Sequence, residues 1–384
     1  MKRDTSISIC KGIAIILMVV GHAEAPALLS SFIYEFHMPL FFITAGYFFS
    51  LKYLDREADF VKRRLKGLYV PFVEWSLFFL IIHNWMFRIG ILNEQYGNVT
   101  GGVTHPYGWH QAEQNIWNIF FSMGGYDEFL AGAFWFFRAL LVASVLYLVL
   151  FKVFTALDAA IQRRQGRDYE SPQASPRVAV RIGVGICVFL FLIILWKTMD
   201  RINIVTLVQK GDRDLVGCLF FGVGFLFRYC LERIPRRWWL TLAYAAVVLA
   251  FAKWYNASMT YIIKGDKFLA LILPAVLGFL MTYDVSKVLD RHDNLLRRFL
   301  IYCGDNTLCI FVLHIVSFKV VSLIKIAYYG LDPLQIGCHM VIHDHSSEDL
   351  FWILYSVAGV GIPLTVNYLY HKLQSQCVRK GTEG

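Results

Sequence analysis

Residues 8–23 read SICKGIAIILMVVGHA and lie within an apolar stretch that is long enough to cross a bilayer as a helix. The stretch nevertheless contains two ionisable side chains, Lys11 and His22. Because an ionisable group in hydrocarbon is costly, each one marks a candidate functional residue. Eleven residues turn a helix by about 1100°, so both side chains face the same side, about 16 Å apart along the axis. This spacing predicts a site that holds a long anionic substrate.

Similar apolar stretches recur along all 384 residues. Hydrophobic residues make up 57% of the chain and charged residues 17%, whereas soluble domains are about 25% charged. We therefore predict one domain, 1–384, with an all-α fold: a polytopic integral membrane protein with about ten transmembrane helices. The predicted spans are 7–26, 32–51, 68–89, 130–154, 178–197, 214–232, 238–255, 268–284, 299–325 and 350–371.

The placement of Lys and Arg predicts the orientation in the membrane. With a cytoplasmic N-terminus, the cytoplasmic segments hold 24 Lys and Arg residues and the outer segments hold 8. Since positive residues accumulate inside, both termini are expected in the cytoplasm. The bias also accounts for the net charge of +9 without a nucleic-acid partner, and a basic inner face attracts anionic membrane lipid.

Three connecting segments are long. Residues 155–177 are polar and predict a flexible cytoplasmic loop, whereas 90–129 and 326–349 are larger outer loops. Trp109 and Trp117 in the first outer loop are candidates for stacking on sugar rings, and the alternative is an interfacial aromatic belt. The second outer loop contains several histidines, but their spacing does not frame a metal site, and no metal is expected.

The second span contributes a further imidazole. It opens with FHMPLFF, residues 36–42, which places His37 near the outer end, close to His22. Histidine suits proton transfer near neutral pH, so an imidazole here could deprotonate a hydroxyl or carry an acyl group itself. The alternative is a histidine whose only role is a hydrogen bond to a neighbouring helix.

These residues and several later ones resemble the motifs of one family. Lys11 and His22 match the basic-x10-His motif of the membrane acyltransferase family 3, and FHMPLFF resembles the second signature of its fucose O-acetylase-like branch. Three later segments are similar to further motifs: KRRLK at 62–66 before YVPF, FWFFRALL at 134–141, and CGDNTL at 303–308 followed by Leu313 and His314.

The resemblance implies a ten-helix fold in the bacterial cytoplasmic (inner) membrane. Members transfer an acyl group, usually acetyl from acetyl-CoA, to a carbohydrate hydroxyl, so a cell-envelope glycan or lipid-linked sugar is the expected acceptor. His22 would be the catalytic histidine and Lys11 its basic partner. Members often carry an acidic residue three positions before the basic one, where this chain has Ser8; Asp4 is the nearest substitute.

The residues agree with this chemistry. Coenzyme A carries several phosphate charges at one end of a long flexible arm, and basic groups at the inner boundary would hold them. The candidate cofactor-binding residues are Lys11, Arg63, Arg64 and Lys66, although basic runs of this kind usually only set topology.

Other candidates lie deeper in the spans. Arg138 is a candidate catalytic residue, paired with Glu35, Glu24 or the substrate, or else a residue that snorkels to the interface. Trp135 and His314 join the two loop tryptophans as candidate substrate contacts, and a structural hydrogen bond is an equal alternative for His314.

A second class of function uses the same residues. Intramembrane His, Lys and Arg could form the relay of a proton-coupled transporter or glycan flippase. Such a carrier predicts two related halves with interrupted helices, and the sequence has no evident symmetry of that kind. A receptor or scaffold that kept the fold and lost activity is a third reading, which the Lys11–His22 pair disfavours.

Overall fold

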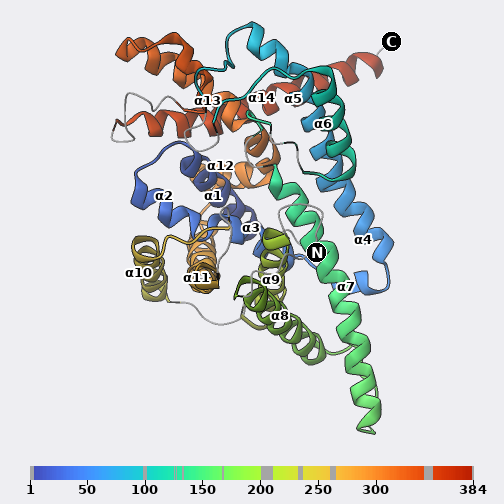
Figure 1. The fold of residues 1–384 in the computed structure, drawn as a ribbon. Coiled ribbons are helices and arrows are strands. Elements are labelled where there is room, and N and C mark those ends of the chain that lie inside the picture. Colours follow the sequence, from blue (N-terminus) through green and yellow to red (C-terminus); the bar gives the residue numbers. More distant parts are fainter. Residues whose placement is uncertain are drawn as a thin grey trace.

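The computed structural model of the protein is built from α-helices (Figure 1). It describes residues 4–97, 102–124, 126, 128–131, 134–166, 168–199, 211–231, 237–259, 265–340 and 349–382. The helices are α1 (Thr5–His22), α2 (Ala27–Tyr34), α3 (His37–Tyr47), α4 (Glu57–Arg64), α5 (Val70–Arg88), α6 (Trp109–Phe121), α7 (Trp135–Arg164), α8 (Pro176–Met199), α9 (Asp212–Leu226), α10 (Trp238–Trp254), α11 (Gly265–Leu289), α12 (Leu295–Asp305), α13 (Thr307–Tyr329) and α14 (Phe351–Thr382).

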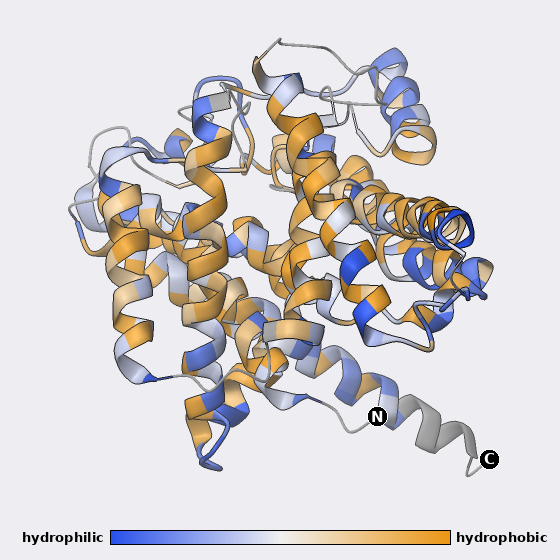
Figure 2. Cartoon of the chain, turned by 90° about the horizontal axis from the view of Figure 1, so that it is seen from below, coloured by the Kyte–Doolittle hydropathy of each residue, from blue (hydrophilic) through white to orange (hydrophobic). Residues whose placement is uncertain are grey.

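Eight helical segments of the described chain are long and apolar enough to cross a membrane. They include α1, α2 with α3, and α4 with α5, and then five single helices, α7, α8, α11, α13 and α14. Two further predicted spans correspond to α9, extended by the π-helical turn Phe227–Leu231, and to the shorter apolar helix α10. Hydrophobic residues run along most of these helices (Figure 2). The all-α membrane class is therefore confirmed, while the count of ten spans stays a prediction.

The second predicted span, 32–51, is broken into α2 and α3 at residues 35 and 36. Pro39 explains the break, because proline cannot donate to the carbonyl four residues earlier and its ring clashes with it. Pro39 instead occupies the first turn of α3, where backbone N–H groups have no intrahelical partner in any case. At the break, the Glu35 side chain accepts a hydrogen bond from the backbone N–H of Ala257 (3.0 Å).

The segment predicted as a flexible loop, 155–177, is partly helical. Its first ten residues continue α7 to Arg164, and α8 begins at Pro176. Side chains fasten the stretch: Asp158 accepts from Arg181 at 2.7 Å, and Gln162 accepts from the backbone of Glu170 at 3.0 Å. These local bonds cannot be read from polarity alone, which is why the helix exceeds the predicted span of 130–154.

α1 crosses α12 at a very close approach. A side chain at Gly12 would place Cβ 2.1 Å from the carbonyl oxygen of Leu300, and one at Gly304 would place it 1.9 Å from that of Ser8. The two glycines thus face each other across the crossing and let the backbones touch. This contact gives a structural reason for the glycines beside Lys11 and before the DNTL residues.

Two hydrophobic clusters form the core. One gathers residues of α3, α7, α8, α9 and α11, and the other gathers residues of α1, α5, α13 and α14. Phe41, Leu68 and Phe136 are half-buried and pack against both clusters. The seam between the clusters is where the candidate site lies.

Candidate active site

α1 and α13 bring two histidines together. His22 Nδ1 lies 2.9 Å from His314 Nε2, and the two rings stack with centroids 5.1 Å apart. His314 is fully buried, and its other nitrogen, Nδ1, lies 2.8 Å from the carbonyl oxygen of Phe311. The two residues are 292 positions apart in sequence, so the pair depends on the packing of the first helix against a late one.

The partners of these nitrogens assign the protons. A carbonyl oxygen only accepts, so His314 Nδ1 carries the hydrogen and donates it to Phe311. Neutral His314 then has an acceptor lone pair on Nε2, which must receive the Nδ1–H of His22. Neutral His22 is left with a lone pair on Nε2, which has no hydrogen-bond partner among the described residues. The chain of hydrogen bonds therefore prepares Nε2 of His22 to take a proton.

His37 lies nearby but is bonded differently. Its Nδ1 is 2.9 Å from the carbonyl oxygen of Ile33, so Nδ1 donates and Nε2 is an acceptor. The ring of Tyr34 contacts both imidazoles, with its centroid 6.4 Å from that of His22 and 5.2 Å from that of His37. The structure thus places His37 beside the pair, and the direct ring partner of His22 is His314.

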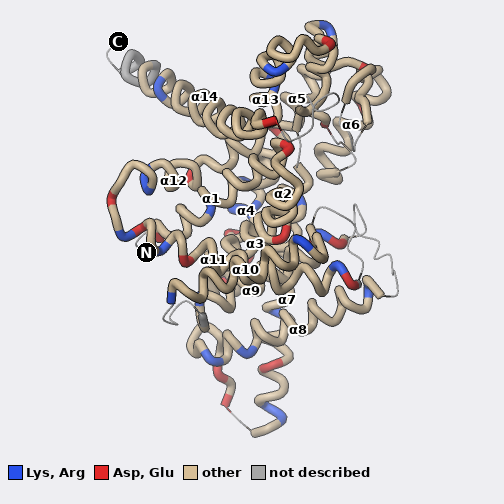
Figure 3. Tube along the Cα trace, turned by 90° about the vertical axis from the view of Figure 1, so that its left-hand side faces the viewer, with Lys and Arg blue, Asp and Glu red and all other residues tan. Residues whose placement is uncertain are grey.

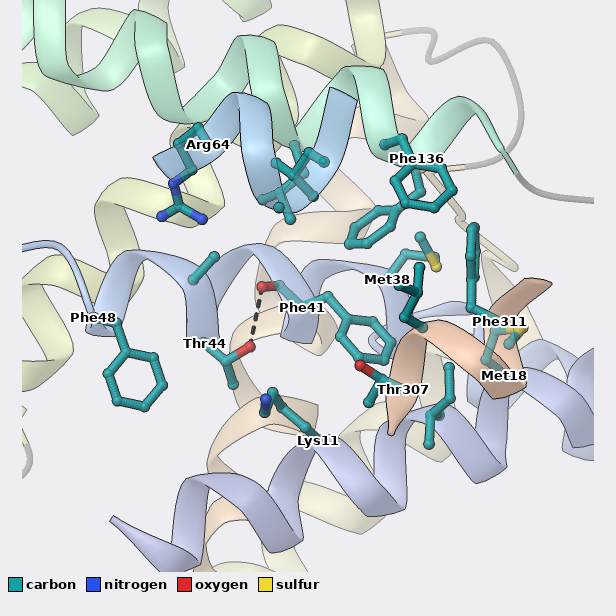
Figure 4. Close-up of a pocket in the computed structure, with 17 residues that line it drawn as sticks. Lys11, Met18, Met38, Phe41, Thr44, Phe48, Arg64, Phe136, Thr307 and Phe311 are labelled. Carbon is teal, nitrogen blue, oxygen red and sulfur yellow. Dashed lines mark hydrogen bonds between the residues drawn. The ribbon is translucent and has the colours of Figure 1, made fainter. Parts of the chain in front are cut away.

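A cavity of about 290 Å³ lies beneath this pair, along the seam of the two core clusters (Figure 4). Met18, one turn before His22, and Phe311, one turn before His314, line the end nearer the histidines. Lys11 and Arg64 line the other part of the cavity from opposite walls. The remaining lining is largely apolar, with hydroxyl groups from Thr44 and Thr307. The cavity is thus mostly apolar, with two cations in one part, and Met18 and Phe311 each lie one helical turn from a histidine of the pair.

The predicted cofactor-binding residues divide into two sets. Lys11 and Arg64 line the cavity, and the Arg64 guanidinium lies 5.1 Å from the ring centroid of Phe60. Arg63 and Lys66 are exposed and do not line it. Arg63 instead lies over the Tyr53 ring at 6.0 Å. Helical geometry explains the division, because adjacent residues on a helix point about 100° apart.

Arg138 is buried on α7 and faces α9. Its guanidinium lies 3.8 Å from a carboxylate oxygen of Asp214, and it does not line the cavity. Asp214, an acid at the start of the sixth predicted span, is therefore a partner of Arg138 that the sequence analysis did not name. Trp135, one turn earlier, carries the guanidinium of Arg213 over its ring at 4.5 Å.

The loop tryptophans lie on α6, which packs against α5. The hydroxyl of Tyr69 donates to the carbonyl oxygen of Phe120 at 2.8 Å, and Asn84 bonds the backbone of Tyr107. α6 therefore runs beside α5 rather than forming an open loop (Figure 1). Trp109 and Trp117 are 87% and 64% exposed, and neither lines the cavity of the histidine pair.

A buried hydrogen-bond network, which the sequence analysis did not identify, joins α5 to the segments on either side of α6. His83 Nδ1 lies 2.9 Å from Glu128 Oε2, and its Nε2 lies 2.9 Å from the carbonyl oxygen of His105. Tyr107 stacks on His83 at 3.6 Å and donates to Glu128. Both nitrogens of His83 are engaged, so it ties the segment after α5 to that helix. The cost of an ionisable residue in a span applies to His83 as well, and this signal could have identified it.

The segment that follows α13 is also held by hydrogen bonds from buried side chains. His339 Nε2 donates to the carbonyl oxygen of Phe129 at 2.6 Å, and Lys319 Nζ donates to the carbonyl oxygen of Ile336 at 2.6 Å. Burial lowers the pKa of His339 to about 4, and the charge on Lys319 acts in the same direction. His339 is thus neutral near pH 7 and joins two connecting segments close to His22. The predicted loop residues His343 and His345 lie outside the described residues.

Comparison with known proteins identifies the family. A family model described as an acyltransferase domain matches residues 4–371, nearly the whole chain. The chain belongs to the membrane acyltransferase family 3. No curated protein and no solved structure matched it. The cavity and the histidine pair are therefore features of a member of this acyltransferase family.

Proposed function

We propose that this acyltransferase moves an acetyl or other short acyl group from acyl-CoA, normally acetyl-CoA, to a hydroxyl of a cell-envelope glycan or lipid-linked sugar. The observation that carries the proposal is the hydrogen-bonded pair His22–His314, which leaves Nε2 of His22 as an acceptor beyond a cavity lined by Lys11 and Arg64. Membership of the acyltransferase family supports the reaction type.

The cavity fits the donor in a specific way. A volume of about 290 Å³ is small for a whole nucleotide cofactor but suits the flexible arm that ends in the thioester. Lys11 and Arg64 would then bind phosphate groups at the cationic end by charge-assisted hydrogen bonds. The arm would run toward Met18 and Phe311, which brings the thioester to the histidine pair.

The chemistry follows from the proton assignment. Nε2 of His22 takes the proton of the acceptor hydroxyl as its oxygen attacks the thioester carbonyl. The new C–O bond forms, the C–S bond breaks, and the leaving thiolate takes the proton back from the imidazolium. Throughout, the Nδ1–H of His22 stays bonded to His314, which holds the ring in position and in the required tautomer. Transfer through an acyl-histidine on the same Nε2 is the alternative within this class.

The acceptor class is tested in cells. We expect that deletion of the gene lowers the O-acetyl content of the envelope glycans, measured by NMR, and that the wild-type gene restores it while His22→Ala does not. An unchanged acetyl profile, with the gene shown to be expressed, would contradict glycan acetylation.

The bacterial inner membrane is the proposed location, with both termini in the cytoplasm. A fusion of the C-terminus to a fluorescent protein that matures only in the cytoplasm reports this orientation.

A further inference from the structure

A second hollow lies between the first turns of α10 and the last turns of α11. Its volume is about 880 Å³, and it shares no lining residue with the cavity of the histidine pair. α10 and α11 lie side by side away from α4 and α5 (Figure 1). The proposed acyl transfer does not use this groove.

Three cationic side chains line the groove: Arg237, Lys287 and Arg291. Among the described residues, none of the three forms an ion pair, whereas Arg297 and Arg298 nearby bond Asp290 and Asp293. Three cations therefore line this groove, against the single carboxylate of Asp284.

One acidic residue and the N-terminus of α10 also contribute to the charge of the groove. Asp284 lines the groove, but it is buried and its Oδ2 accepts from the hydroxyl of Thr241 at 3.2 Å. The first turn of α10 has no side-chain cap on its backbone N–H groups, and a helix N-terminus favours an anion. The balance of charges thus favours an anionic ligand.

The other walls are apolar. Leu242, Val285 and Val288 line the groove, and all three are exposed on the outer surface of their helices. Trp238 and Trp239 stand at the same end as the cations, with 75% and 50% of their surface exposed. Tryptophan at the end of a spanning helix is typical of the membrane–water interface. A cationic end at the interface beside an apolar wall matches a molecule with a charged head and hydrocarbon chains.

We propose that this groove binds one anionic phospholipid. Its phosphate contacts Arg237, Lys287 and Arg291, and its acyl chains lie along Leu242, Val285 and Val288. Basic pockets between spanning helices are known to hold anionic head groups, and each Lys or Arg near an anionic surface adds to the attraction. A soluble phosphate would gain nothing from the apolar wall, which is why we assign a lipid.

Lipid binding in this groove would also affect α1, the helix that carries Lys11 and His22. α11 ends one residue before Asp290, whose carboxylate accepts from Thr5 (2.6 Å) and Ser6 (2.9 Å) at the start of α1. A lipid that stabilises the end of α11 therefore stabilises the attachment of α1.

Native mass spectrometry of the purified full chain in detergent tests the assignment. A phosphatidylglycerol is titrated against a phosphatidylcholine with the same acyl chains. The wild type should bind one phosphatidylglycerol at least tenfold more tightly than phosphatidylcholine. The triple variant Arg237→Gln, Lys287→Gln, Arg291→Gln should lose at least tenfold in that affinity.

The matched control removes three other exposed cations, Arg163→Gln, Arg164→Gln and Arg177→Gln, which do not line the groove. It should bind phosphatidylglycerol as the wild type does. Equal losses in both triple variants, or no preference for the anionic lipid, would overturn the proposal. So would displacement of the lipid by millimolar inorganic phosphate, because the ligand would then be a free anion. If the groove variant fails to fold, the single variants Lys287→Gln and Arg291→Gln replace it, with a severalfold loss expected in each.

Discussion

His314 acts on the proposed reaction through His22. Without an acceptor on His314, nothing among the described residues holds the hydrogen of His22 on Nδ1. The other tautomer would place that hydrogen on Nε2, the atom that must be free to accept a proton. His314 is therefore a positioning residue, and its substitution should affect the rate more than binding.

We expect His314→Leu to lower kcat about 100-fold, within the range attributed to general-base catalysis, with little change in KM for either substrate. His314→Gln keeps an acceptor oxygen and should recover about tenfold of that loss. Steady-state kinetics on both purified variants check this. Equal losses in the two variants, or an effect confined to KM, would show that His314 does not orient His22.

Arg64 and Arg63 form a natural pair for a test of donor binding, because only Arg64 lines the cavity. Arg64→Gln should raise KM for acetyl-CoA about tenfold, since one charge-assisted phosphate contact contributes about 1.5–3 kcal/mol. Arg63→Gln should change KM less than twofold. With acetyl-pantetheine, which lacks the nucleotide phosphates, the two variants should behave alike. A similar KM for acetyl-CoA in both variants would refute the assignment of Arg64.

At the scale of the residue, the sequence singled out two residues that the structure places at the candidate site, but it did not identify their partners. Lys11 and His22 stood out because charge in a span is costly, and both lie at the candidate site. The neighbouring span suggested His37 as the partner of His22, but the ring contact comes from His314. Arg138 likewise pairs with Asp214, an acid that no local pattern connects to it. Such pairings depend on which helices pack together, and helical periodicity does not contain that information.

At the scale of elements, the crossing of α1 and α12 holds in place the helix that carries Lys11 and His22. Gly304→Ala would force Cβ into the backbone of Ser8, where no flexible side chain can yield. We expect a loss of about 1–3 kcal/mol in the free energy of unfolding, typical of overpacking. Gly361→Ala on α14 is the control, because its Cβ meets nothing within 4 Å and alanine favours a helix. Thermal unfolding in detergent should show a lower Tm only for Gly304→Ala; equal Tm values would refute the close crossing.

The attachment of α1 to α11 should depend on pH. Burial alone would raise the pKa of Asp290, but hydrogen bonds from Thr5, Arg297 and Ser6 bring it below its usual value. A carboxylate with a lowered folded pKa stabilises the protein above its unfolded pKa of about 3.9, and this contribution is lost as the pH falls through the folded value.

Asp290→Asn should therefore lower the stability by about 1 kcal/mol near pH 7, and its difference in Tm from the wild type should shrink as the pH falls below about 3.9. Asp293→Asn is the control, because Asp293 is exposed and bonds Arg298 at the surface. A difference between wild type and Asp290→Asn that stays constant from pH 7 to pH 3 would contradict this origin.

The elements themselves were largely predictable, and their ends were not. Long apolar runs identified the helices because a membrane leaves few other structures for them. Pro39 contained the signal for the break between α2 and α3. Proline has no N–H to donate to the carbonyl four residues earlier, and its ring clashes with that carbonyl. The extension of α7 through 155–164 had no such signal, because it rests on the contacts of Asp158 and Gln162.

On the scale of the whole molecule, the candidate site lies between two hydrophobic clusters rather than within one. Charged residues gather mainly toward helix ends and connecting segments (Figure 3). Lys11, at the cationic part of the cavity, lies nearer the start of α1, whereas His22 is the last residue of α1. In the proposed reaction, the phosphates of the donor would therefore lie toward the start of α1 and its thioester toward the end of α1.

In the proposed reaction, His22 is the base that takes the proton of the acceptor hydroxyl as it attacks the acyl donor in this cavity. The most direct measurement is the release of free thiol from acetyl-CoA by the purified protein in detergent, with and without an added sugar acceptor. We expect release that depends on the acceptor, falls at least 1000-fold in His22→Ala, and leaves acetyl-CoA binding to that variant intact by calorimetry. Thiol release that is unchanged in His22→Ala, or uptake of a sugar into vesicles without thiol release, would contradict the account.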